Sequence, residues 1–233
     1  MITVTLPKIF QPYYCNNLVR LGKNHDGGYL VNEQDILKTK TLLSFGIGED
    51  WSFEEQFTDL NDCPLIAYDG TLKIDEVKEN ENLYTKYKDF FKDKKTHIEK
   101  NVGNNSFETS FNSVIVGDGI FLKCDIEGAE YRILHDILIH SKLFTGMVIE
   151  FHAITKPENY NSLTNFISKI DQKLAHIHIN NYFYYKTDKE CIPDIVELTF
   201  TSSSNLELHK NISLPNNLDM RNNPEEDEFK INF

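Results

Sequence analysis

The sequence predicts an α/β protein built on a mostly parallel sheet, and three observations support this prediction. The first is the apolar run Thr41–Phe45, followed by the turn Gly46-Ile47-Gly48 and by a helix start at Ser52–Glu55 with the spacing of a capping box. The second is Asp69, which ends the next apolar run about 20 residues after the second glycine. The third is the alternation of short apolar runs with helical patterns over residues 41–180.

The glycine turn is the first candidate for a ligand site. Glycines let the backbone approach a ligand closely, and the N-terminus of the following helix offers free N–H groups. A carboxylate at the end of the second strand is the group that accepts from ribose hydroxyls in βαβ folds, which makes Asp69 the candidate here. Alternatively, Gly46 and Gly48 form an ordinary tight turn, and Asp69 followed by Gly70 is a turn or a helix cap.

Composition limits the class of protein. The chain has 233 residues, of which 40% are apolar, which fits a single domain with one sizeable core. Its formal net charge of −12 argues against nucleic acid or an anionic membrane as the main partner. Residues 1–14 lack the pattern of a secretory signal, and the four cysteines form no CxxC pair. We therefore expect a cytoplasmic protein with free thiols.

Residues 1–40 are expected to form an N-terminal entry segment, 41–201 the core sheet and 202–233 an irregular tail. Asp26-Gly27-Gly28 lies between two short apolar runs and predicts a hairpin over residues 20–31. A simple hairpin explains this pattern. The functional alternative is a lid over a ligand site, with Tyr29 or Lys23 touching the ligand.

The remaining elements follow from apolar periodicity. One amphipathic helix is expected over 72–95. A polar loop at 103–106 follows, and if the ligand carries a base ring, Asn104 of this loop is the candidate for contacting its edge. The last two strands have no helix between them and should be antiparallel. Beyond the opening unit, strands are expected at 64–68, 97–102, 119–124, 146–149, 175–180 and 195–200, with helices at 52–61, after residue 130 and at 157–173.

Polar side chains collect where these strands end. Because the carboxyl ends of parallel strands meet at one edge of the sheet, these groups should lie close together and suit acid–base chemistry or a divalent metal. Each also has a plainer explanation, since Asp125 can cap a helix and His152 can be a hydrogen-bonded loop residue. The residues are Asp50, Asp69, Asp125, Glu127, Glu150 and His152.

Four motifs together resemble the FkbM-type methyltransferases over residues 18–200. They are Asp26-Gly27-Gly28-Tyr29, Ser44-Phe45-Gly46-Ile47-Gly48, Lys123-Cys124-Asp125-Ile126-Glu127-Gly128-Ala129-Glu130 and Ile149-Glu150-Phe151-His152. The resemblance implies a Rossmann-like class I methyltransferase fold: an α/β sheet of seven strands in the order 3-2-1-4-5-7-6, the last antiparallel, with helices on both faces. It also implies S-adenosylmethionine as cofactor and O-methylation of sugars or other secondary metabolites.

The resemblance assigns roles residue by residue. Gly46 and Gly48 match the cofactor loop, Asp69 matches the ribose acid, and Asp125 and Glu127 match the block after strand four. Ser44 stands where many such enzymes have an acid, and Asp50 replaces the third glycine, so Asp125 is a candidate for holding the methionyl ammonium. The complete expected cofactor set is Tyr29, Gly46, Gly48, Asp50, Asp69, Gly70, Asn104, Asp125 and Glu127.

The leading hypothesis is methyl transfer to a sugar hydroxyl in surface-glycan (capsule) biosynthesis. His152 is the first candidate for the base, with Glu150 orienting it or serving as the base, and Asp125 beside them. The sequence shows no spacing typical of metal ligands, so no metal is assigned. An alternative form of the mechanism has Mg²⁺ held by Asp125, Glu150 and His178.

Two other functions share parts of this pattern. A nicotinamide dehydrogenase is disfavoured because the acids after the glycine turn would repel a pyrophosphate. A non-catalytic sugar- or protein-binding module on the same fold stays open, as does a homo-oligomer.

Overall fold

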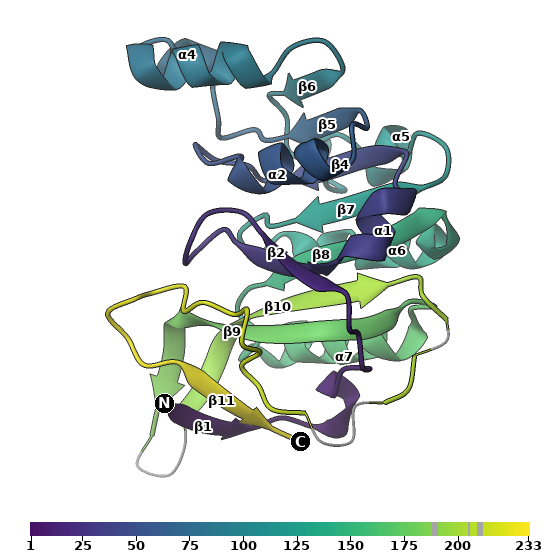
Figure 1. Cartoon of the computed structure of the whole chain (residues 1–233), viewed down its shortest axis with the longest axis vertical. Helices are drawn as coiled ribbons and strands as arrows, with labels where there is room; N and C mark the ends of the chain where they lie inside the picture. Colours follow the sequence, from purple (N-terminus) through teal and green to yellow (C-terminus); the bar gives the residue numbers. More distant parts are fainter. Residues whose placement is uncertain (188–190, 205, 209–211) are drawn as a thin grey trace.

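The computed structural model describes residues 1–187, 191–204, 206–208 and 212–233, and its centre is a seven-stranded sheet (Figure 1). The strand order is β6-β5-β4-β7-β8-β10-β9. Strands β4 to β8 run parallel, and β10 is antiparallel to both of its neighbours. The predicted order and orientation are therefore confirmed. The bounds are β4 (Thr41–Phe45), β5 (Leu65–Tyr68), β6 (Lys95–Ile98), β7 (Ile120–Cys124), β8 (Phe144–Phe151), β9 (Lys173–Lys186) and β10 (Cys191–Thr201).

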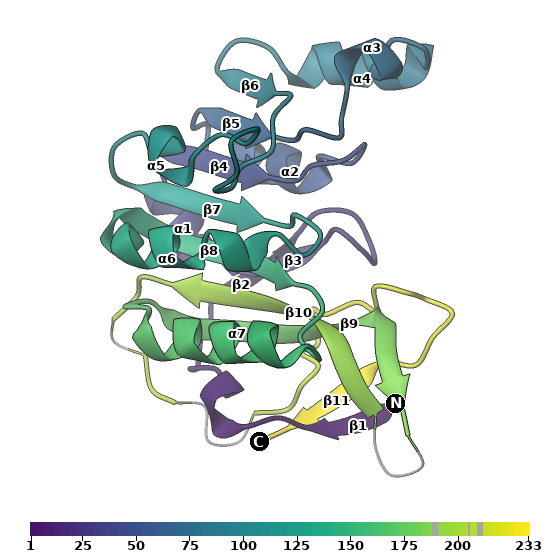
Figure 2. The ribbon, with the colours of Figure 1, turned by 180° about the vertical axis from the view of Figure 1, so that it is seen from behind.

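Helices cover both faces of the sheet, as Figures 1 and 2 show from opposite sides. The strands are consequently apolar on both faces, which is the pattern of a buried parallel sheet. Leu42 packs in the core beneath one helical layer and Leu43 in the core beneath the other. One face carries α1 (Glu33–Lys38) and α2 (Ser52–Leu60), with α3 (Ile74–Val77) and α4 (Glu81–Phe90) beyond them; the other carries α5 (Phe111–Val114), α6 (Leu134–Ile139) and α7 (Pro157–Lys169).

The predicted hairpin in the N-terminal segment is confirmed as β2 (Leu18–Leu21) and β3 (Tyr29–Asn32). The Arg20 guanidinium closes its loop by donating to the carbonyl oxygens of Lys23 and His25, at 2.6 and 2.8 Å. All four residues of β3 are buried, and Thr199 Oγ1 of β10 donates to the carbonyl oxygen of Leu30. The strands of the hairpin thus pack on the sheet, and its loop reaches the carboxyl edge.

The prediction of an irregular tail is wrong for its last residues. β11 (Phe229–Asn232) pairs in parallel with β1 (Ile2–Thr5) to form a separate two-stranded sheet. Phe229 and Ile231 are buried while Lys230 and Asn232 are exposed, which is the alternation of a half-buried strand. Four residues are too short a pattern to identify without knowing the partner at the other end of the chain.

Several element boundaries also differ from expectation. The single helix expected over 72–95 is two helices, because Asn80 starts α4 by accepting from the Leu83 N–H. Strand β6 lies at 95–98 rather than 97–102, and β8 extends through Glu150 and Phe151. The capping box does not form: the Asp50 carboxylate accepts from the Ser52 N–H, and the Ser52 hydroxyl accepts from the Lys23 N–H instead.

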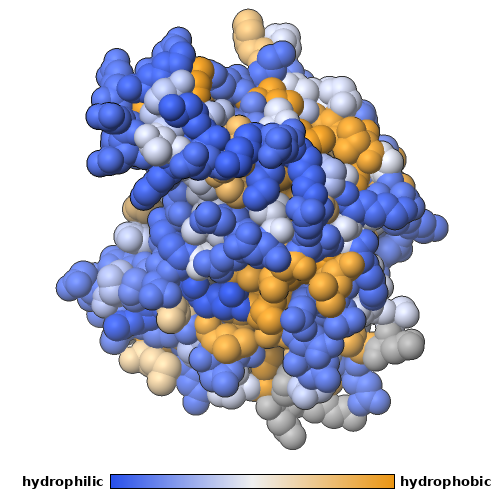
Figure 3. Space-filling view, turned by 45° about the horizontal axis from the view of Figure 1, so that its top comes forward, coloured by the Kyte–Doolittle hydropathy of each residue, from blue (hydrophilic) through white to orange (hydrophobic). Residues whose placement is uncertain are grey.

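The surface seen in Figure 3 is mostly hydrophilic, with apolar side chains gathered in patches, in keeping with the net charge of −12. Within the described ranges, no helix is both long and apolar enough to cross a membrane.

Candidate active site

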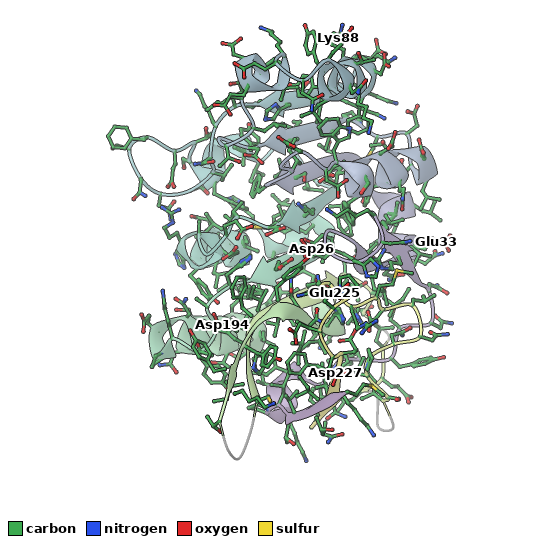
Figure 4. The ribbon with its side chains drawn as sticks, turned by 90° about the vertical axis from the view of Figure 1, so that its left-hand side faces the viewer. Asp26, Glu33, Lys88, Asp194, Glu225 and Asp227 are labelled. Carbon is green, nitrogen blue, oxygen red and sulfur yellow. The ribbon has the colours of Figure 1, made fainter. Side chains whose placement is uncertain are left out.

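A cavity of about 370 Å³ opens at the carboxyl ends of β4, β5 and β7. The connections that follow the neighbouring strands β4 and β7 lead to helices on opposite faces of the sheet, and open α/β sheets bind ligands at such a point. Figure 4 looks toward this edge, and the labelled Asp26 of the hairpin loop lies near its centre. Six residues of the predicted site line the cavity: Gly46, Gly48, Asp50, Asp69, Asp125 and Glu127.

The two positions of the turn require glycine for different structural reasons. Gly46 has a φ of 74°, and a Cβ there would lie 1.7 Å from the carbonyl oxygen of Asp125. Gly48 has a φ of 51° but faces open space: beyond its chain neighbours, no atom of the described residues lies within 4 Å of the position that a Cβ would take. Gly46 therefore brings β4 and β7 together, whereas Gly48 leaves room for a ligand against the backbone.

Asp69 holds the glycine turn in place. Its Oδ2 accepts from the Ile47 and Gly48 N–H groups at 2.9 and 2.8 Å. Its Oδ1 accepts from the Thr71 N–H and hydroxyl and from the Leu72 N–H. These five donors fill the roughly four lone-pair sites of a carboxylate. Ribose binding by Asp69 stays a prediction, and it requires one of these donors to yield to a ribose hydroxyl.

The charge of Asp69 should stabilise the fold above acidic pH. Burial raises its pKa, but the hydrogen bonds from Thr71, Gly48 and Ile47 outweigh burial and lower the pKa from 3.8 to about 2. A lowered pKa in the folded state contributes stability above the unfolded value, and this is lost as the pH falls toward the folded value.

We expect Asp69→Asn to lower the free energy of unfolding by roughly 2 kcal/mol at neutral pH. The difference from wild type should shrink as the pH falls from about 4 to about 2. Urea unfolding at several pH values measures this, with Asp59→Asn on the exposed surface of α2 as the control. A difference that stays constant with pH would contradict the role of the charge.

Glu54 and Lys123 were missed by the sequence analysis and form the floor of the cavity. Glu54 of α2 is 1% exposed, and its Oε1 accepts from the Ser44 hydroxyl at 2.5 Å. Its other oxygen, Oε2, is buried and has no hydrogen-bond partner in the part of the chain that the structure describes. Glu54 thus brings a carboxylate over Ser44, the position where the resemblance expects an acid. The sequence did hold one indication of this pair: Lys123 lies within the apolar strand β7, and a buried lysine needs a nearby carboxylate.

Lys123 is held by backbone and charge. Its ammonium donates to the carbonyl oxygen of Gly46. Burial lowers its pKa, but the carboxylates of Glu54, Asp125 and Glu150 outweigh burial and raise it. The side chain therefore keeps its positive charge beneath the glycine turn.

Other predicted residues lie near the cavity without lining it. These residues are Gly70 and Asn104; Asp50, by contrast, lines the cavity, and its carboxylate pairs with Lys23 Nζ at 3.2 Å. The Gly70 N–H donates to Asn101 Oδ1, and the Asn104 amide donates to the carbonyl oxygen of Arg132. Asn101 and Arg132 are the cavity residues at those places. Contact of Gly70 and Asn104 with a cofactor stays a prediction.

His152 lies beside the cavity, at the centre of four carboxylates. Its Nδ1 is 3.0 Å from Glu130 Oε1, which also accepts from the Ile126 and Gly128 N–H groups. Because a carboxylate oxygen only accepts, Nδ1 is the donor in this contact, and Nε2 faces the other acids. Nε2 lies 3.4 Å from Glu127, 3.7 Å from Glu150 and 3.9 Å from Asp125.

Charges set the pKa of His152. Burial lowers it, but the hydrogen bond and charge of Glu130, with smaller contributions from Asp125 and Glu127, outweigh burial and raise the pKa above its ordinary 6.5.

Tyr29 and Glu150 form a buried layer behind this cluster. The Tyr29 hydroxyl lies 3.0 Å from Asp125 Oδ2 and 2.9 Å from Glu150 Oε2, so its single proton is shared between these two acceptors. Asn180 donates to Glu150 Oε1 and, more weakly, to Asp26. Burial, followed by the charge of Asp125, raises the pKa of Glu150 well above its usual range. Tyr29 therefore holds Asp125 and Glu150 together, and its contact with a cofactor stays a prediction.

His178 does not lie with Asp125 and Glu150, as the alternative mechanism with Mg²⁺ expects, but in a different cluster of acids. Its Nδ1 lies 3.3 Å from Glu197 and its Nε2 3.4 Å from Glu228. Burial lowers its pKa, but Glu197 and Glu228 outweigh burial and raise it. The grouping of His178 with Asp125 and Glu150 as metal ligands is therefore wrong, because both of its nitrogens are already committed to other acids.

Comparison with known proteins gives structural likeness only. No family model and no curated protein matches the sequence. Similar solved structures include the delta-N METTL16 MTase domain, with 11% identity, 71% of this chain and 75% of that chain covered, and a TM-score of 0.41. The fibrillarin pre-rRNA processing protein of Methanococcus jannaschii has 13% identity, coverage of 72% and 68%, and a TM-score of 0.43.

A further similar structure is precorrin-6y C5,15-methyltransferase from Geobacter metallireducens GS-15, with 12% identity, coverage of 73% and 85%, and a TM-score of 0.42. The strand order and the strand orientations define the fold. These give the chain the α/β Rossmann-like fold of the class I methyltransferases, with an antiparallel strand at the edge of the sheet.

Proposed function

We propose that this chain is an S-adenosylmethionine-dependent O-methyltransferase that acts on a sugar or carbohydrate-linked hydroxyl. The observation that carries the proposal is the cavity of about 370 Å³ on the glycine turn, with an unpartnered buried carboxylate oxygen of Glu54 in its floor. This volume lies within the range of small-molecule sites.

The charges lining the cavity support this cofactor. Seven of the lining residues are acidic and three are basic, and Lys23 and Arg132 are already paired with Asp50 and Glu108. Such a wall repels phosphates but tolerates a sulfonium and an ammonium. When bound, the cofactor supplies an electrophilic methyl group.

The buried floor suits the methionyl end of the cofactor. Glu54 Oε2 has no partner and is available to an ammonium, and Lys123 carries the positive charge that a carboxylate needs. Gly48 leaves open space for close approach of the adenosine part, and Asp69 and Asp50 are the candidates for its ribose. A buried carboxylate oxygen without a partner is costly, and an incoming cation offsets that cost.

The acceptor hydroxyl would lie at the Asp125 side of the cavity, near His152. A sugar hydroxyl is a weak nucleophile, so its proton must leave through this cluster. His152 is the first candidate for the base because its Nε2 faces Asp125 and Glu127, which line the cavity. Glu130 holds the ring through Nδ1, whereas Glu150 lies 3.7 Å from Nε2 and is the second candidate for the base. A capsule or other surface-glycan sugar stays our proposal for the acceptor, in the cytoplasm.

The experiment is methyl transfer from isotopically labelled S-adenosylmethionine to a panel of mono- and oligosaccharides, read by mass spectrometry. We expect at least one acceptor to gain a single methyl group on oxygen. Binding of S-adenosylhomocysteine without transfer to any acceptor would instead favour a non-catalytic binding protein, which is the alternative function.

A further inference from the structure

The ring of His152 lies within a cluster of acidic side chains. Four carboxylates approach its ring within 4 Å: those of Asp125, Glu127, Glu130 and Glu150. Carboxylates gathered in this way repel one another unless a cation lies among them.

Three of these side chains present free donor atoms to a common point. A carboxylate oxygen of Asp125, a carboxylate oxygen of Glu127 and a ring nitrogen of His152 all lie within 4.8 Å of one another. Independently, Asp125 Oδ1 is a buried oxygen that has no hydrogen-bond partner among the described residues, and it is the oxygen that faces His152 Nε2. A buried oxygen without a protein partner calls for an explanation, and a bound ion or water is one that also satisfies its lone pairs.

The orientation of His152 is that of a metal ligand. Histidines that bind metals almost always donate their other ring N–H to a carboxylate or a carbonyl group. Here Glu130 accepts from Nδ1 and is itself fixed by two backbone N–H groups, so Nε2 is the nitrogen presented to the cluster.

We propose that Asp125, Glu127 and His152 Nε2 bind a divalent cation of the Mg²⁺ or Mn²⁺ type. Two carboxylate oxygens favour hard cations, and one imidazole is compatible with Mn²⁺. Three protein ligands leave coordination positions for water and for the acceptor hydroxyl. The consequence for catalysis rests on the proposed function: the cation would lower the pKa of a bound hydroxyl, and His152 would act as a ligand rather than as the base.

Mn²⁺ is the probe, because its free ion is quantified directly by electron paramagnetic resonance. The full chain is freed of metal with a chelator and titrated with Mn²⁺, and Mg²⁺ is then added as a competitor. We expect one saturable Mn²⁺ site per chain, displaced by Mg²⁺. Glu127→Gln should weaken Mn²⁺ binding at least about tenfold. Because the Glu127 side chain is exposed, this variant should fold normally.

Glu49→Gln is the matched control, since it removes the same charge from another exposed acid of the same cavity. Its Mn²⁺ affinity should stay within about twofold of wild type, because screening at the surface is strong. The absence of a saturable site, or equal weakening by Glu127→Gln and Glu49→Gln, would overturn the proposal.

Separate measurements test the cation site and the proposed function, so one can be disproved without the other. Calorimetry with S-adenosylhomocysteine in chelator tests the cofactor alone. Cofactor binding without Mn²⁺ binding would remove only the cation, whereas Mn²⁺ binding without cofactor binding would remove the methyltransferase assignment.

Discussion

Gly46→Ala should destabilise the protein by at least about 3 kcal/mol and prevent the cavity from forming. A Cβ at this position would lie 1.7 Å from the carbonyl oxygen of Asp125, and the φ of 74° is strained for any side chain. Neither strand can move away easily, because β4 and β7 are hydrogen-bonded in register up to Phe45 and Cys124. Urea unfolding followed by circular dichroism measures the loss.

Gly48→Ala is the control for this substitution. It has a similar positive φ of 51° but no atom within 4 Å of the added Cβ, so it should cost only about 1 kcal/mol. Equal destabilisation by the two alanines would mean that backbone conformation alone, and not the contact between β4 and β7, explains Gly46.

His152→Ala should reduce methyl transfer by about 10²- to 10⁴-fold while leaving the affinity for S-adenosylhomocysteine within about twofold of wild type. His152 stands outside the lining of the cavity, behind Asp125 and Glu127, so its loss removes acid–base or ligand chemistry without opening the cofactor site. Steady-state turnover and calorimetry on the same preparation separate the two effects.

The matched control is His135→Ala, because His135 is exposed on α6. It should leave turnover and cofactor affinity unchanged. Wild-type turnover in His152→Ala would remove this residue from the mechanism, both as a base and as a cation ligand.

Local patterns were sufficient for the sheet. The apolar runs of β4 and β7, and the glycine turn after β4, are contiguous in sequence, and the strand order followed from the resemblance that they support. β11 could not be predicted, because its partner β1 lies at the opposite end of the chain. The capping box failed for a similar reason: the Ser52 hydroxyl bonds to the hairpin loop at Lys23, a contact that its own helix does not reveal.

The candidate site divides in the same way. Gly46, Gly48, Asp125 and Glu127 were predictable because they follow strand ends directly. Glu54 was not, since within α2 it resembles an ordinary surface acid, and only the packing of α2 over Ser44 buries it. His178 lies in a run of alternating apolar and polar residues that predicts a strand. This pattern gives no information about the two acids on either side of its ring.

Isothermal titration calorimetry with S-adenosylhomocysteine tests the central claim most directly. We predict one site per chain for wild type, and a loss of affinity of at least about tenfold in Glu54→Gln because one charge-assisted contact to the ammonium is removed. Methylthioadenosine lacks the amino-acid part and should bind both proteins equally. Absence of binding by S-adenosylmethionine and S-adenosylhomocysteine to the folded wild-type chain would contradict the account.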